Sequence, residues 1–112
     1  MNQELITQLN QSFNQISQTW EDSGIEYWFA RDLQELLEYS EWRNFLKVIE
    51  KAKEACENSG GKVENHFVAV NKMVVIGSGA ERPIEDIMLT RYACYLIAQN
   101  GDPRKDAIAF AQ

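Results

Sequence analysis

The segment from Tyr39 to Gly61 is the longest amphipathic stretch of the chain and constrains the fold more than any other. At 100° per residue its apolar side chains fall within one arc of a helical wheel. These side chains are Trp42, Phe45, Leu46, Val48, Ile49, Ala52 and Cys56. Ser40 is placed to serve as N-cap, and Gly60 as the left-handed residue that ends the helix. The sequence therefore predicts a helix over residues 41–59 with one face buried in a core.

The opposite arc of this helix carries a basic stripe of Arg43, Lys47 and Lys51, one turn apart. Glu50 and Glu54 fall on or beside the same arc. One interpretation is a solvated face, on which these acids pair with the two lysines at i,i+3 spacing. Arg43 and Lys47, however, have no acid between them in the first half of the helix, where recognition helices usually contact bases. The second interpretation is therefore a nucleic-acid contact made by these first turns.

The net charge of −6 is unevenly distributed along the 112 residues. Residues 1–41 hold eight acids and one base, and residues 42–112 hold nine acids and ten bases, which gives −7 and +1. A uniformly acidic protein would repel nucleic acid. The uneven distribution leaves room for a local basic surface after residue 41.

Length and composition indicate one globular domain, since 45% of residues are apolar and 25% charged. No apolar run approaches the ~20 residues of a membrane span, and the N-terminus has no secretory signal pattern. We therefore expect a cytoplasmic protein that makes no membrane contact. Cys56 and Cys94 lie within helical patterns, which favours reduced core thiols over a disulfide.

Residue patterns for catalysis or metal binding are missing from the sequence. His66 is the only histidine, and no cysteine lies at ligand spacing from it. Carboxylate pairs occur at positions 21 and 22, 50 and 54, and 85 and 86. None has an apolar setting that would raise a pKa for acid–base chemistry, so we interpret all three pairs as solvated surface. We expect no enzyme activity, no cofactor and no metal.

The first segment, residues 1–22, has apolar residues spaced three and four apart, which predicts an amphipathic helix from Glu4 to Trp20. These residues are Ile6, Leu9, Phe13, Ile16 and Trp20. The spacing also suits a coiled-coil seam and hence a homodimer, but it lasts little over two heptads where about three or four are typical. We favour packing of this helix onto the chain's own domain, residues 23–112, with the homodimer as the alternative.

The remaining segments predict short strands and helices. Thr90 can cap a helix that is apolar nearly all round, so that helix should be buried. Residues 62–71 are ambiguous between a loop and a short helix and are left unassigned. The predicted elements are a strand at 25–30, a helix at 31–39, a hairpin of strands at 72–76 and 83–89, and helices at 91–99 and 104–110. This order favours an α+β fold, in which a small antiparallel sheet, one strand plus the hairpin, packs against several helices.

Two further features bear on nucleic-acid binding. The helices before and after Ser40 form a helix-turn-helix-like corner, which DNA-binding modules share with many other proteins. Other cations extend the basic stripe only if the fold brings them to the same side of the molecule. They are Lys72, Arg82, Arg91, Arg104 and Lys105.

The run from Tyr27 to Ser40 resembles the opening signature of the Bro-N domain of phage and viral antirepressor-like proteins. It reads Trp28-Phe29-Ala30-Arg31-Asp32-Leu33, followed by Leu37-Glu38-Tyr39-Ser40. Glu38 stands where that signature usually has glycine. The resemblance implies a domain related to viral DNA-binding modules.

A closer resemblance, over residues 25–112, is to the bacterial DNA-damage-inducible protein D family. Its motifs include Tyr39-Ser40-Glu41-Trp42-Arg43, Ala52-Lys53-Glu54-Ala55-Cys56-Glu57-Asn58-Ser59-Gly60, Arg91-Tyr92-Ala93-Cys94-Tyr95-Leu96 and Gln99-Asn100-Gly101-Asp102-Pro103. The resemblance implies an SOS-response protein that restrains RecA filaments, an α+β fold, no catalytic residue, and a chain longer than this one. The predicted last helix has no stop signal, which agrees with that length. Carried over by position, the residues of interest are Arg31, Tyr39, Ser40, Trp42, Arg43, Arg91 and Tyr92.

These observations lead to two hypotheses. The first is a non-enzymatic DNA-damage-response domain in which Arg43 and Lys47, with Arg31, Arg82 or Arg91, engage DNA or a RecA–DNA filament. The second is a protein-interaction or dimerisation module of an antirepressor-like regulator that makes no direct DNA contact. A steep salt dependence of nucleic-acid binding would distinguish the first from the second.

Overall fold

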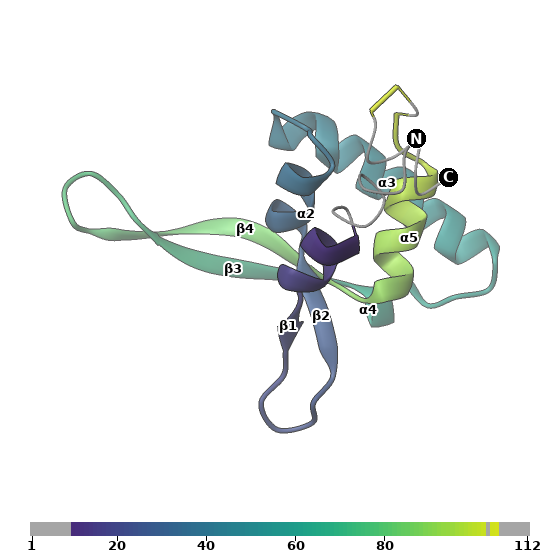
Figure 1. Ribbon diagram of the computed structural model, residues 1–112, viewed down its shortest axis with the longest axis horizontal. Helices are drawn as coiled ribbons and strands as arrows, with labels where there is room; N and C mark the ends of the chain where they lie inside the picture. The colour runs from purple at the N-terminus through teal and green to yellow at the C-terminus, as the bar shows by residue number, and fades with distance from the viewer. Residues whose placement is uncertain (1–9, 103, 106–112) are drawn as a thin grey trace.

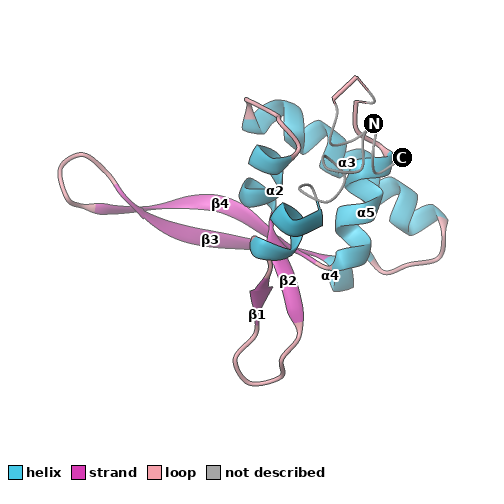
Figure 2. Ribbon diagram, viewed as in Figure 1, coloured by secondary structure: helices cyan, strands magenta, loops and turns pink. Residues whose placement is uncertain are grey.

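The computed structural model describes residues 10–102, 104 and 105, which form an α+β fold as predicted. A four-stranded antiparallel sheet has the order β1-β2-β4-β3, and the longer helices gather beside it (Figures 1 and 2). Residues 10–15 are helical. The elements that follow are β1 Gln18–Thr19, β2 Glu26–Phe29, α2 Ala30–Leu36, α3 Trp42–Asn58, α4 Val63–His66, β3 Phe67–Val75, β4 Glu81–Leu89 and α5 Arg91–Gln99.

The core lies between α3, α5 and the base of the sheet. Phe45 and Ile49 of α3, Ile97 of α5 and Trp28 of β2 are completely buried. The predicted apolar arc of α3 is confirmed, because five of its side chains are buried and Trp42 and Leu46 pack against the same cluster. Among the described residues, no helix combines the length and apolar composition needed to cross a membrane.

The predicted helix from Glu4 to Trp20 is wrong at its C-terminal end, and its positions before residue 10 lie outside the described residues. The helical turns end at residue 15, and β1 pairs with β2. The Trp20 N–H donates to Ile25 O over 2.8 Å, which closes a hairpin that turns at Gly24 with φ +70°. Backbone pairing with β2 overrides the helical spacing here, because hydrogen bonds to β2 take the place of helical ones for the N–H and C=O groups of this segment.

The N-cap prediction for α3 is also wrong. Glu41 occupies the cap position, and no side chain caps the helix. Ser40 is exposed and stands one residue too early. Gly60 does adopt the predicted left-handed conformation, with φ +88°.

The hairpin is confirmed and its strands are longer than predicted. β3 includes residues 67–71, which had no sequence preference, because each of them has a partner in β4. The hairpin projects from the helices as an arm (Figure 1). The Gly77-Ser78-Gly79 turn lies at its end, where Gly79 has φ +84°.

Helix α5 begins at its predicted cap, where the Thr90 hydroxyl accepts from Ala93 N–H over 3.2 Å. Its burial was overestimated, since Tyr92 and Tyr95 are 38% and 52% exposed. A tyrosine on a helix surface can bury its ring edge and still present its hydroxyl to polar partners. The predicted helix at 104–110 lies mostly outside the described residues.

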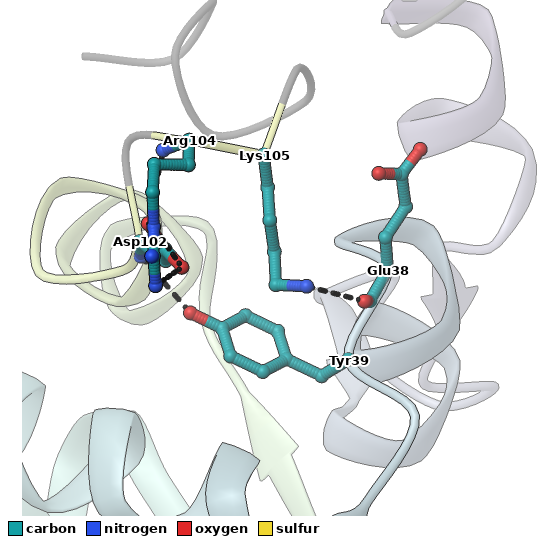
Figure 3. A network of polar contacts seen from close by, with 5 residues as sticks. All are labelled: Glu38, Tyr39, Asp102, Arg104 and Lys105. Carbon is teal, nitrogen blue, oxygen red and sulfur yellow. Dashed lines mark hydrogen bonds and ion pairs between the residues drawn. The ribbon is translucent and has the colours of Figure 1, made fainter.

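The turn between α2 and α3 contains a strained residue, Glu38, whose φ is +65°. A network of polar contacts holds this turn (Figure 3). The Asp102 N–H donates to Tyr39 Oη over 3.0 Å, and Lys105 Nζ donates to Glu38 O over 2.8 Å. Arg104 hydrogen-bonds both oxygens of Asp102 and lowers the pKa of that carboxyl to about 2. Position 38 thus needs a left-handed backbone, which explains a glycine in the family signature.

Replacing Glu38 by glycine should therefore stabilise the domain. We expect Glu38→Gly to raise the free energy of unfolding by about 0.5–1 kcal/mol, because it removes the steric cost of a left-handed side chain. Urea denaturation followed by circular dichroism measures the change. Glu38→Ala is the matched control, since it removes the exposed carboxylate and keeps the strain. Equal effects of the two substitutions would contradict this account.

Candidate nucleic-acid interface

The basic stripe of Arg43, Lys47 and Lys51 lies on the surface of α3 that faces away from the core. The helix buries Phe45, Ile49, Ala52 and Cys56 on one side, so residues about half a turn away must point outward. All three basic side chains are exposed. Among the described residues, none of the hydrogen bonds or ion pairs found involves these three side chains. Their charges are therefore available to an external anion.

The predicted ion pairs of this face are wrong. Glu50 pairs with Lys53, whose Nζ lies 3.3 Å from Glu50 Oε1, and not with Lys47. Lys51 has no described ion-pair partner, although Glu54 was its expected one. An exposed i,i+3 pair contributes only a few tenths of a kcal/mol, so which of two lysines engages Glu50 depends on small differences in side-chain direction.

The N-terminal turn of α3 adds to the positive character of the stripe. Because the Glu41 side chain makes no capping hydrogen bond, the first N–H groups of α3 keep the partial positive charge of a helix N-terminus. Arg43 is the second residue of this turn. Glu41 is the acid closest to Arg43 in the sequence, and its carboxylate accepts from Asn44 Nδ2 over 3.5 Å.

Arg31 is part of an internal clamp and does not belong to the interface. Its Nε donates to Glu85 O over 2.7 Å, and its guanidinium lies 4.2 Å from the centre of the Trp42 ring. Trp42 Nε1 in turn donates to Glu85 Oε1 over 2.7 Å. This clamp, Arg31 with Trp42 and Glu85, joins the starts of α2 and α3 to β4.

The clamp is completed by Asp86, which sequence reasoning placed on the solvated surface. Asp86 is only 1% exposed, and its Oδ1 accepts from the N–H groups of Arg31 and Ile87 over 3.1 and 2.8 Å. Its Oδ2 has no hydrogen-bond partner among the described residues and lies 3.9 Å from Lys72 Nζ. The sequence alone could not show which of the two adjacent acids of β4 is buried. Helix α2 covers the side of the strand on which Asp86 lies, so that side does not face water.

Arg91 is also used within the domain. Its guanidinium makes two hydrogen bonds with Glu26, of 2.8 and 3.1 Å, and lies 5.1 Å from the centre of the Trp28 ring. The hydrogen bonds with Glu26 raise the pKa of Arg91, and they lower the pKa of Glu26. An arginine held on two sides in this way joins α5 to β2 and has little freedom to reach a phosphate.

The other predicted cations are distributed over the fold and do not extend the stripe. Arg82 is exposed near the turn of the arm, which projects away from the helices (Figure 1). Lys72 lies near Asp86 and 4.2 Å from the centre of the Phe29 ring. Arg104 and Lys105 are engaged at the turn shown in Figure 3. Of the five predicted binding residues, the structure brings only Arg43 and Lys47 together on one free surface.

The family-motif residues have mostly structural contacts. Tyr39 packs 5.3 Å from Phe45 and Trp42 packs 6.3 Å from it, as measured between ring centroids. Tyr92 Oη lies 3.0 Å from Ser59 Oγ and shares a hydrogen bond with it, which ties α5 to the end of α3. Ser40 is exposed, with no contact described for its hydroxyl. The contacts of these motif residues therefore fix the position of α3 and do not indicate what it binds.

Comparison with known proteins places this fold in a family. Residues 15–112 match the BRO family, N-terminal domain, and the chain therefore belongs to the Bro-N family. The match begins ahead of β1 and runs through every strand and helix named above. No solved structure matches the chain at a significant level.

A relative from Escherichia coli strain K12 is more specific. The chain is 56% identical over 90 residues to DNA damage-inducible protein D of that organism. The alignment covers 80% of this chain and 33% of the relative. The chain thus corresponds to about a third of the length of that relative.

Proposed function

We propose that this domain is a non-enzymatic regulator in the response to DNA damage and that it contacts nucleic-acid phosphates through the basic stripe of α3. One observation carries the proposal. Arg43, Lys47 and Lys51 are exposed at one-turn intervals and have no ion-pair partner among the described residues, whereas Arg31 and Arg91 hold the domain together. The name of the Escherichia coli relative, DNA damage-inducible protein D, supports the link to DNA damage.

The ligand we favour is DNA, alone or within a RecA–DNA filament. Three side chains that neutralise phosphates release about three counterions, so log K should fall against log salt with a slope near −2.7. A rise from 50 to 200 mM salt would then weaken binding roughly 40-fold. Titration of single-stranded DNA, double-stranded DNA and RecA filaments at both salt concentrations identifies the preferred ligand.

Reversing the first two charges of the stripe should remove the binding. We expect Arg43→Glu combined with Lys47→Glu to weaken DNA affinity by more than about tenfold and to flatten the salt slope by about two, because two phosphate contacts are lost. Both side chains are exposed, so stability should change by no more than about 0.5 kcal/mol. Fluorescence anisotropy with labelled DNA measures affinity, and thermal unfolding checks the fold.

The control is Lys62→Glu, which makes the same kind of charge change at an exposed lysine beyond the end of α3. It should lower affinity only slightly through the overall charge. Binding that ignores salt, or a double variant that binds like the Lys62→Glu protein, would contradict a role for the stripe.

The alternative of a protein-interaction module that makes no DNA contact stays open, and a dimer through the N-terminal helix stays a prediction. Phe13 belongs to the apolar spacing on which the prediction of that dimer rests. Its ring stacks on Trp28, with centroids 4.5 Å apart, so a charge at position 13 would disturb the domain itself. A dimer test should therefore use other positions.

A further inference from the structure

Strand β3 forms an open edge of the sheet. It is nine residues long, and among the described strands it pairs only with β4. Met73 and Val75 are 55% and 70% exposed, and Val68 is 45% exposed. A long, apolar edge strand is a template for another strand unless the chain protects it.

The hydrogen bonds at the turn show which backbone groups of β3 point outward. Ile76 N–H donates to Ala80 O over 2.9 Å, so these two residues form a hydrogen-bonded pair. Such pairs alternate along an antiparallel ribbon, so the next pair, Val75 with Glu81, turns its backbone groups away from the partner strand. The same alternation assigns outward N–H and C=O groups to Ala69, Asn71, Met73 and Val75.

A contact elsewhere in the arm agrees with this assignment. Asn71 is paired with Glu85, which should also turn its carbonyl out of the ribbon. Glu85 O indeed accepts from Arg31 Nε, on the side of β4 opposite to β3. The outward groups of β3 have no such acceptor or donor among the described residues.

The two edges of the arm differ in their protection. On β4, Pro83 pairs with Met73 at an outward position, and proline has no N–H to offer. Charged residues at positions 81, 82 and 85 surround it. On β3 the same stretch has no proline, and its one charge, Lys72, lies beside Asp86. Of the two edges of the arm, only that of β4 is therefore protected against pairing with another strand.

We propose that β3 is the pairing edge for a second copy of this chain, with the two β3 strands antiparallel about a two-fold axis. An antiparallel arrangement of identical strands closes the interface after one partner, so it yields a dimer and no fibre. It joins the two sheets and satisfies the outward backbone groups of both strands. This surface is distinct from the basic stripe of α3.

Side chains favour a register with Asn71 opposite its own counterpart. Lys72 then lies opposite Val70 of the second copy, so the two lysines are not opposed. Met73 of the second copy lies opposite Ala69, on the side of the sheet where an open groove of about 450 Å³ borders Trp42 and Leu46. Charged side chains of Glu50, Lys53 and Glu85 also line this groove, and Trp42 and Leu46 give it an apolar part that the methionine side chain can contact.

A cysteine at the two-fold axis tests the register. Residues in a hydrogen-bonded antiparallel pair have Cα atoms about 5.5 Å apart, within the range that a disulfide spans. Asn71→Cys should therefore give a covalent dimer on mild oxidation, at least about tenfold faster than Ser78→Cys at the arm's tip, because paired thiols have a high effective concentration. The native cysteines are buried, and burial raises the pKa of Cys94, so neither should react.

Sedimentation velocity tests the dimer without oxidation. The wild-type chain should show a concentration-dependent dimer, and Asn71→Pro, which removes an outward N–H and no bond to β4, should remain monomeric with an unchanged circular dichroism spectrum. A wild-type chain that is monomeric at every concentration would overturn the proposal. So would equal cross-linking rates for Asn71→Cys and Ser78→Cys, or a dimer that the proline leaves intact.

Discussion

Trp28→Ala is expected to lower the free energy of unfolding by about 3–5 kcal/mol, because Trp28 is the largest fully buried side chain among the described residues and its removal leaves a cavity. The Trp28 side chain is completely buried. It stacks on Phe13, donates from Nε1 to Phe13 O over 2.8 Å, and lies beneath the Arg91 guanidinium. One residue thus joins the N-terminal turns, the sheet and α5.

The matched control is Trp28→Phe, which keeps an aromatic ring against Phe13 and removes the indole N–H. We expect it to cost about 1–2 kcal/mol, from one hydrogen bond and a smaller ring. Urea denaturation measures both variants, and hydrogen exchange should show that residues 10–16 lose protection in Trp28→Ala. A loss below about 1 kcal/mol for Trp28→Ala would contradict a central role for this contact.

Asp86→Ala should be nearly as damaging, although it removes a polar group from a protein core. The Asp86 carboxylate accepts from two backbone N–H groups, and alanine would leave both without an acceptor. Each unsatisfied buried group costs about 1–3 kcal/mol, so a loss of roughly 2–6 kcal/mol is expected for the two groups. Arg31 and the start of α2 should loosen from β4 in this variant.

Asp86→Asn separates the hydrogen bonds from the charge. Its amide oxygen can accept from both N–H groups, so most of the stability should return, whereas the attraction of Lys72 is lost. Chemical denaturation measures the two variants side by side. If Asp86→Asn were as unstable as Asp86→Ala, the charge and not the two acceptor contacts would hold the clamp.

The contacts of Arg31 and Arg91 explain why a domain with 11 basic residues exposes only a small basic surface. Arg31 and Arg91 were both candidates for phosphate contact. Each instead meets a carboxylate or carbonyl and an aromatic ring, contacts in which a planar guanidinium is well matched. They set the positions of α2 and α5, and α5 in turn supports the buried face of α3 and so fixes which of its sides is exposed.

Local patterns in the sequence were sufficient where one element decides its own structure. The apolar arc of α3, the Thr90 cap of α5, the turn of the arm and the left-handed Gly60 were all predicted correctly. Periodicity and capping act over one or two helical turns, so they are readable without knowing what lies nearby. The same reasoning left Arg43 and Lys47 without an acidic partner, but it wrongly paired Lys51, which has no ion-pair partner among the described residues.

Contacts between distant residues could be read only from the folded chain. Strand β1 exists because β2 pairs with it, Asp86 is buried because α2 covers it, and Arg91 is occupied because Glu26, 65 positions away, meets it. Glu50 likewise pairs with Lys53 and not with Lys47. Burial and partner choice depend on which segments the tertiary structure brings together, and helical or strand spacing carries no record of that. The exposed basic stripe of α3 is therefore readable from local sequence. That Arg31 and Arg91 are engaged within the domain could be seen only in the tertiary structure.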